Sequence, residues 1–114
     1  MSDNCLFCRM SQGLVPVDKV FEDEQLFAIK DINPRAPVHV MIIPRQHIPS
    51  VVDLSESESE LLTHIVLTAN RVAQLQGIDK SGYRLAFNVG DDGGQTIYHL
   101  HLHVLGGREL GSEA

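Results

Sequence analysis

The 114-residue chain lacks the features that define several large protein classes. It has no excess of positive charge, since 9 Lys and Arg against 15 Asp and Glu give a formal net charge of −6, and this argues against a nucleic-acid partner because phosphates are held by basic patches. No apolar run approaches the roughly 18 residues that a membrane-spanning helix requires. The N-terminus has neither the basic start nor the apolar core of a signal peptide. We therefore expect one cytoplasmic domain, residues 1–114, without internal repeats and with no membrane partner.

Cysteine is also scarce. Cys5 and Cys8 are the only two, in a Cys-x-x-Cys pair. A disulfide framework is not expected in a reducing compartment, which leaves a metal half-site, a redox pair or two ordinary thiols. A thioredoxin-like redox pair follows a strand in a βαβ unit. Only four residues precede this pair, so a redox role is the weakest of the three.

The spacing of apolar residues predicts an α+β fold, with a long helix packed on one face of an antiparallel sheet of about five strands. The N-cap of a short first helix would be Asn4. A capping box at Ser55 and Glu58 opens the long helix, and Gly77 ends it. Its buried stripe would comprise Leu61, Ile65, Ala69, Val72 and Leu75. The expected elements are a short helix at 5–12, strands at 19–22, 25–30, 38–43, 83–89 and 98–105, and the long helix.

The segment 98–105 contains three of the six histidines, His99, His101 and His103, alternating with apolar residues. Successive side chains of a strand point to opposite faces, so the three imidazoles would share one face. Partly buried imidazoles need hydrogen-bond partners, and the row therefore indicates a functional site. The spacing leaves two chemistries open. One is zinc ligation by alternate histidines, and the other is a histidine nucleophile or acid–base system.

A glycine-rich stretch, 90–96, directly precedes the row of histidines. Glycines allow backbone amides to approach an anion closely. The stretch does not match the P-loop pattern. Alone it would indicate a hairpin turn, but beside three histidines it favours a phosphate site.

The segment 94–108, Gly-Gln-Thr-Ile-Tyr-His-Leu-His-Leu-His-Val-Leu-Gly-Gly-Arg, resembles the histidine-triad motif. The chain is similar to the nucleotide-binding (Hint) branch of the histidine triad (HIT) superfamily from about residue 5 to 108. The resemblance implies a HIT domain with its motif core at 83–108 and a tail at 109–114, and a homodimer. It also implies a purine nucleotide phosphoramidase that cleaves phosphoramidates or acyl-adenylates at the α-phosphorus through a covalent nucleotidyl-histidine. The alternatives are a dinucleoside polyphosphate hydrolase and a nucleotide-binding regulatory module.

The same resemblance implies roles for individual residues. His101 would be the nucleophile, and His103 and His39 would support it and interact with the phosphate. Asp31 would hold the ribose hydroxyls, and no metal would be required for the chemistry. Phosphate or leaving-group contacts would come from Asn88, Gly94, Gln95 and Thr96. The walls of the base pocket would be Leu6, Phe7, Met10, Val15, Ile29 and Ile32.

Four further residues, Cys5, Cys8, His47 and His99, resemble the ligands of a structural zinc ion found in some HIT proteins, many of them bacterial. Two thiolates and two imidazoles suit a closed tetrahedral site. A His99 that binds zinc cannot also be a free acid or base. The short tail and the absence of tryptophan leave the leaving-group preference open, and the sequence does not distinguish adenine from guanine.

Overall fold

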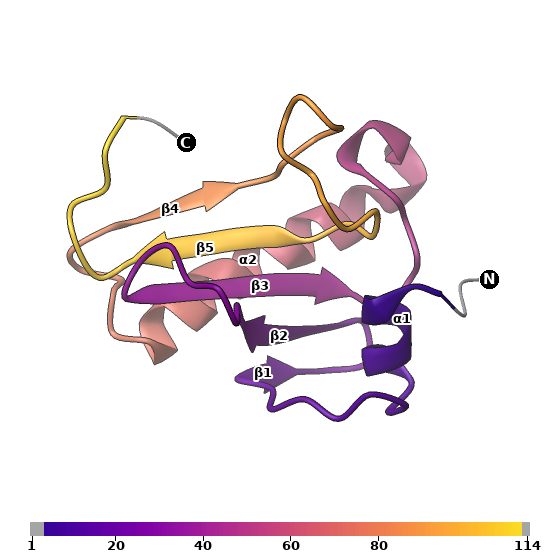
Figure 1. Ribbon diagram of the computed structural model, residues 1–114, viewed down its shortest axis with the longest axis horizontal. Helices are drawn as coiled ribbons and strands as arrows, with labels where there is room; N and C mark the ends of the chain where they lie inside the picture. Colours follow the sequence, from indigo (N-terminus) through magenta and orange to yellow (C-terminus); the bar gives the residue numbers. More distant parts are fainter. Residues whose placement is uncertain (1–3, 113–114) are drawn as a thin grey trace.

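A computed structural model describes residues 4–112 as five antiparallel strands and two α-helices (Figure 1). The strand order in the sheet is β1-β2-β3-β5-β4. The predicted α+β fold is therefore confirmed. The strands are β1 (Phe21–Glu22), β2 (Leu26–Lys30), β3 (Val38–Pro44), β4 (Tyr83–Ala86) and β5 (Leu102–Gly106). The helices are α1 (Leu6–Ser11) and α2 (Ser59–Leu75), with two 3₁₀ turns, η1 (Val51–Asp53) and η2 (Glu56–Glu58), before α2.

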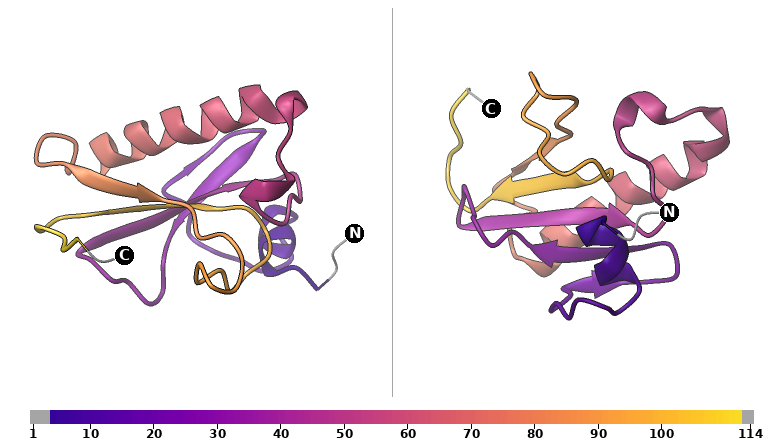
Figure 2. Two further views of the ribbon diagram at one scale, coloured as in Figure 1. Left: turned by 90° about the horizontal axis from the view of Figure 1, so that it is seen from above. Right: turned by 45° about the vertical axis from the view of Figure 1, so that its right-hand side comes forward.

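Helix α2 covers one face of the sheet (Figure 2). Its Ile65, Ala69 and Val72 are buried as predicted, in one cluster with residues of β2, β3 and β5, and Leu61 packs against that cluster. The prediction for Leu75 is wrong, since this last residue of α2 is 52% exposed. The chain turns back at Gly77, where φ is 76°, and buries Ile78 in its place.

Helix α1 and the loop after β4 lie on the other face of the sheet (Figure 2). A second core cluster forms there from one residue of α1 and four residues of β2 and β3: Phe7, Phe27, Ile29, Met41 and Ile43. The N-cap of α1 is Cys5 and not Asn4, because the Cys5 Sγ accepts the backbone N–H of Cys8 at 3.4 Å. A sulfur atom thus performs the capping that an oxygen normally performs.

The last strand begins later than expected, at Leu102 and not at 98. The Leu100 N–H donates to the Ile48 carbonyl at 2.6 Å, so this part of the chain lies outside the sheet. Leu100, Leu102 and Val104 are nevertheless all buried on the α2 side. The predicted alternation of side chains is therefore correct, although the ladder covers only its second half.

The Ser55–Glu58 capping box is present, but it opens the turn η2, and α2 follows at Ser59. The described part of the tail, 109–112, contains neither helix nor strand, and 113–114 lie outside the described residues. Within 4–112, no helix is long and apolar enough to cross a membrane.

Candidate active site and metal centre

His101 lies in the segment that leads into β5, and its ring has a defined proton position. Its Nδ1 is 2.7 Å from the carbonyl oxygen of His99. A carbonyl only accepts, so Nδ1 carries the proton and Nε2 keeps its lone pair. Burial lowers the pKa of His101, while the His99 carbonyl and the Asp31 charge oppose this effect. The ring is therefore neutral at pH 7, and a neutral imidazole with an available lone pair can act as a nucleophile.

A chain of hydrogen bonds fixes the protons of His39 and His103 as well. The Arg35 N–H donates to the His39 Nδ1 at 3.1 Å, which leaves the His39 proton on Nε2. This Nε2 lies 2.9 Å from the His103 Nδ1 and 3.4 Å from an Asp31 carboxylate oxygen. His103 accepts at Nδ1 and so holds its own proton on Nε2. Burial, together with the neighbouring histidines, lowers the pKa of His103 to about 4, so its Nε2–H is a neutral hydrogen-bond donor next to His101.

A pocket of about 320 Å³ opens beside His101, between α1 and the loop after β2. Its polar lining includes Asp31, His101 and His103. Ile32 stands at the mouth and is 91% exposed. Of the predicted base-pocket residues, only Val15 is missing from the lining, and Val17 takes its place. The apolar lining consists of Leu6, Phe7, Met10, Val17, Ile29, Ile32, Met41 and Ile97.

The glycine-rich loop contributes Gly94 and Thr96 to the pocket, and Asn88 joins them from the end of the preceding segment. Gln95, which was predicted to contact the ligand, is buried and does not line the pocket. Its side-chain amide donates to the carbonyls of Pro49 at 2.8 Å and Ile97 at 3.1 Å, and its Oε1 accepts the N–H of Gly90 at 3.1 Å. These three hydrogen bonds show that Gln95 stabilises the loop and does not line the pocket.

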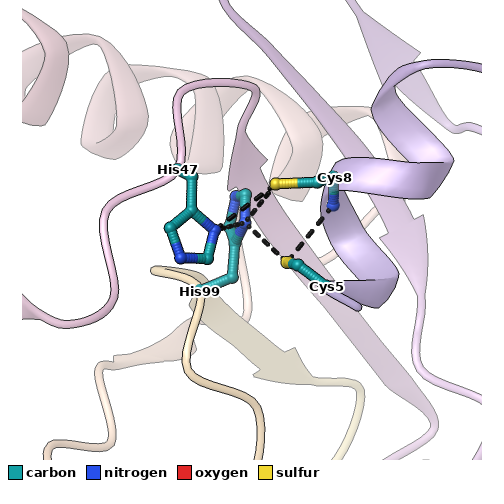
Figure 3. A group of neighbouring side chains, drawn as sticks. All are labelled: Cys5, Cys8, His47 and His99. Carbon is teal, nitrogen blue, oxygen red and sulfur yellow. Dashed lines mark hydrogen bonds between the residues drawn. The ribbon is translucent and has the colours of Figure 1, made fainter. Parts of the chain in front are cut away.

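Cys5, Cys8, His47 and His99 come together at the end of the sheet that α1 covers (Figure 3). The His99 Nε2 donates to the Pro44 carbonyl at 2.7 Å, so its Nδ1 lone pair faces the other three residues. The Nδ1 atoms of His47 and His99 are 3.1 Å apart. The cysteine sulfurs lie 3.2 Å (Cys5) and 3.6 Å (Cys8) from the His99 Nδ1.

These distances match the edges of a tetrahedron around a metal ion. Zinc bonds of about 2.05 Å to nitrogen and about 2.3 Å to sulfur require edges of about 3.3 Å between two nitrogens and about 3.5 Å between nitrogen and sulfur. The distance between the Cys8 Sγ and the His47 Nδ1, 3.3 Å, also fits a nitrogen–sulfur edge of this tetrahedron. Burial lowers the pKa of His99 to about 4, which keeps this ring neutral. The donor set and its geometry therefore fit a four-coordinate metal ion.

Each of the two groups of metal-capable side chains found within 4–112 takes one histidine of the row. His99 belongs to the cysteine group, and His103 belongs to a second group with Asp31 and His39. Neither group contains His101. The arrangement thus gives no support to a metal ion held by alternate histidines.

A second cavity, of about 210 Å³, lies beyond His103, and no sequence pattern predicted it. Three arginines line it: Arg35 from the loop after β2, Arg84 from β4 and Arg108 from the segment that follows β5. Residues 84 and 108 stand in segments that carry the family resemblance, but their spacing does not predict that they meet.

The fold, the three histidines and the adjoining pocket together define a histidine-triad hydrolase. The chain belongs to the HIT superfamily: a family model described as "Scavenger mRNA decapping enzyme C-term binding" matches residues 4–112. The purine nucleoside phosphoramidase of Escherichia coli K12 is 40% identical over 111 residues, which cover 97% of this chain and 93% of that protein. The predicted family is confirmed.

Solved structures agree with this assignment. A HIT family hydrolase from Legionella pneumophila Philadelphia 1 superimposes with a TM-score of 0.94 at 48% identity, covering 96% of this chain and 98% of that one. A Zn-bound histidine triad family protein from Mycobacterium smegmatis superimposes with a TM-score of 0.79 at 30% identity, covering 99% and 81% of the two chains.

Proposed function

We propose that the chain is a purine nucleotide phosphoramidase that hydrolyses phosphoramidates or acyl derivatives of nucleoside 5′-monophosphates through a covalent nucleotidyl-histidine. The observation that carries this proposal is the hydrogen bond from the His101 Nδ1–H to the His99 carbonyl. It leaves the Nε2 lone pair as the reactive atom of a residue that lines the larger pocket. The similarity to the E. coli protein named purine nucleoside phosphoramidase supports this substrate class.

In this proposal the nucleotide occupies the pocket of about 320 Å³. The purine ring packs between the apolar side chains of α1 and Ile32. Two ribose hydroxyls donate to the Asp31 carboxylate, an arrangement that discriminates against ligands without these donors. The phosphate lies by Asn88 and the backbone of Gly94, whose glycine allows a close approach.

The proposed reaction has two steps. The His101 Nε2 lone pair forms a bond to the α-phosphorus as the bond to the leaving nitrogen breaks, and that nitrogen takes a proton from solvent. The His103 Nε2–H donates to a phosphoryl oxygen, and His39 holds His103 in that orientation. Water then attacks the phosphorus, His101 leaves as neutral imidazole, and a proton returns to solvent.

We propose zinc as the metal of the group formed by Cys5, Cys8, His47 and His99. When bound, zinc supplies a rigid cross-link between α1 and the segment before β5, and it takes no part in the reaction. Elemental analysis of the purified protein should give one zinc per chain, against none in a Cys5→Ser, Cys8→Ser double variant. Absence of zinc from protein purified without chelator would contradict this assignment.

We propose a homodimer formed through α2 and β4. Strand β4 is an edge strand with one side unpaired in the described sheet, and edge strands offer backbone groups for further pairing. Leu67 and Leu75 of α2 are 59% and 52% exposed. Light scattering coupled to gel filtration should give twice the chain mass of 12.6 kDa, and a monomer mass would contradict the proposal.

The test of catalysis is intact-protein mass after brief mixing with adenosine 5′-phosphoramidate, for wild type and His101→Ala. A nucleotidyl adduct on wild type alone is expected. Turnover without an adduct, under conditions that trap the intermediate, would indicate direct attack by water. Tight nucleotide binding without adduct or turnover would favour a regulatory binding module.

A further inference from the structure

The second cavity, the basic cavity, lies on the open face of the sheet beside β4 and β5. The pocket of about 320 Å³, in which we place the nucleotide, is called the nucleotide pocket below. The basic cavity shares Arg35, Asn88 and His103 with it, so the two cavities meet at the histidine cluster. The remaining lining is His39, Arg84, Ala86, Leu105, Arg108, Leu110 and Gly111.

The charge of the basic cavity contrasts with that of the whole chain. The chain carries a net charge of −6, yet three of its nine Lys and Arg residues line this cavity, and no described lining residue is acidic. The Arg108 guanidinium donates to the main-chain carbonyls of Arg35 at 3.0 Å and Glu109 at 2.9 Å. Arg84 donates to the Gly111 carbonyl. The two carbonyls that Arg108 contacts orient its guanidinium without cancelling its formal charge, and Arg35 adds a second cation to the lining, so the cavity is suited to an anion.

The position of the basic cavity relative to His101 suits a leaving group. In phosphoryl transfer the attacking and leaving atoms stand on opposite sides of the phosphorus. His101 lines the nucleotide pocket but not the basic cavity, whereas His103 lines both. A phosphorus held beside His101 and His103 can therefore direct its second substituent away from the nucleophile and into the basic cavity.

We infer that the basic cavity binds the leaving group and selects amines that carry a carboxylate or a phosphate group. This inference rests on the proposed phosphoramidase function and specifies its substrate class. At about 210 Å³ against about 320 Å³ for the nucleotide pocket, the basic cavity fits a group smaller than a second nucleotide. This size favours a small acidic amine over a dinucleoside polyphosphate.

The experiment compares three adenosine 5′-phosphoramidates, whose leaving amines are propylamine, β-alanine and 2-aminoethylphosphonate. These differ in the terminal group: uncharged, carboxylate or phosphonate. We expect kcat/KM to be at least about tenfold higher for one or both anionic substrates than for the propylamine compound, because a charge-assisted hydrogen bond of this kind contributes about 1.4 kcal/mol or more. The anionic compound with the higher kcat/KM shows whether the cavity selects a carboxylate or a phosphate group.

Two variants locate the effect. Arg84→Gln removes a charge that lines the basic cavity and not the nucleotide pocket. Arg35→Gln changes a side chain while keeping the main-chain bonds of residue 35 to His39 and Arg108. Each should reduce the anionic preference by about tenfold. The matched control is Arg71→Gln, which removes the same charge from an exposed position on α2, across the sheet, and should leave the preference unchanged.

Binding to His101→Ala separates this inference from the proposed function. If wild type hydrolyses none of the three compounds, the phosphoramidase proposal fails, but calorimetric Kd values of the compounds on His101→Ala still measure the anionic preference. Equal affinity and equal kcat/KM for charged and uncharged compounds would overturn the inference. A preference that survives in both Arg84→Gln and Arg35→Gln would also overturn it.

Discussion

Removal of the zinc ion proposed for Cys5, Cys8, His47 and His99 should destabilise the protein by an amount that follows from the ion's affinity. Helix α1 has six residues, well below the roughly 12–15 at which isolated helices become marginally stable in water. It is held in place by the burial of Phe7, which is 1% exposed, and by the contacts among Cys5, Cys8, His47 and His99, which we call the metal group. An ion present at 100 times its Kd contributes about 2.7 kcal/mol to the folded state. For a domain of this size, this corresponds to a fall in Tm of about 10 °C on chelation.

The same perturbation should weaken nucleotide binding. Three residues of α1, Leu6, Phe7 and Met10, line the nucleotide pocket. The Phe7 ring also contacts the rings of His99 and His101, with centroids 5.7 and 5.3 Å away. Displacement of α1 therefore removes one wall of the pocket. Because coupling between two ligands is reciprocal, AMP should raise the zinc affinity by the same factor by which zinc raises the AMP affinity.

Thermal melts of zinc-loaded and chelated protein, with and without AMP, measure both effects. A Cys8→Ser variant is the control, since it should melt at the temperature of the chelated wild type and should not respond to chelator. A competition titration against a chromophoric chelator gives the zinc affinity in the presence and absence of AMP. Equal melting temperatures for loaded and chelated wild type, or a zinc affinity that AMP leaves unchanged, would refute the reasoning.

Three further changes have defined outcomes. Burial raises the pKa of Asp23, but two backbone N–H donors and His64, 2.7 Å away, lower it by more, so the net effect is a lowered pKa. Asp23→Asn should therefore cost about 1 kcal/mol at pH 7, with the difference shrinking below about pH 4 in urea melts. Gly94 has φ of 83°, so Gly94→Ala should add about 1–2 kcal/mol of backbone strain and raise KM more than it lowers kcat in steady-state assays. The pKa of His103 is lowered from 6.5 to about 4, so between these two pH values the unfolded chain binds a proton at His103 that the folded chain does not bind. The Tm should therefore fall as the pH drops from 6.5 towards 4, and it should fall less steeply in His103→Gln.

The sequence predicted those parts of the site that depend on local alternation or on the family motif. Leu100, Leu102 and Val104 alternate with the histidines, and their burial against α2 follows from strand geometry alone. The metal group combines segments distant in sequence, and only the resemblance to zinc-binding HIT proteins suggested that they meet. The structure brings the potential ligand atoms of these four residues within 4.8 Å of one another.

Other features depend on three-dimensional proximity that no local pattern encodes. The basic cavity exists because β5 pairs with both β3 and β4, which brings Arg84 of β4 close to the loop that carries Arg35. Gln95 lies within the motif, yet its amide is used by carbonyls of Pro49 and Ile97, and this could not be inferred from residue type. Val15 and Val17 have the same side chain, and only the path of the chain after α1 decides that Val17 faces the pocket.

His99 connects the group of Cys5, Cys8 and His47 to the proposed nucleophile, His101, through two different parts of one residue. Its Nδ1 faces the cysteines, and its carbonyl accepts the Nδ1–H of His101. The carbonyl belongs to the main chain, so His99→Asn removes the metal ligand and keeps the acceptor that fixes the His101 tautomer. If the metal acts only by holding the backbone in place, chelation of the wild type and the His99→Asn change should reduce adduct formation to the same extent. A variant that keeps its backbone in place but loses the adduct would instead require that the His99 ring contribute to the reactivity of His101.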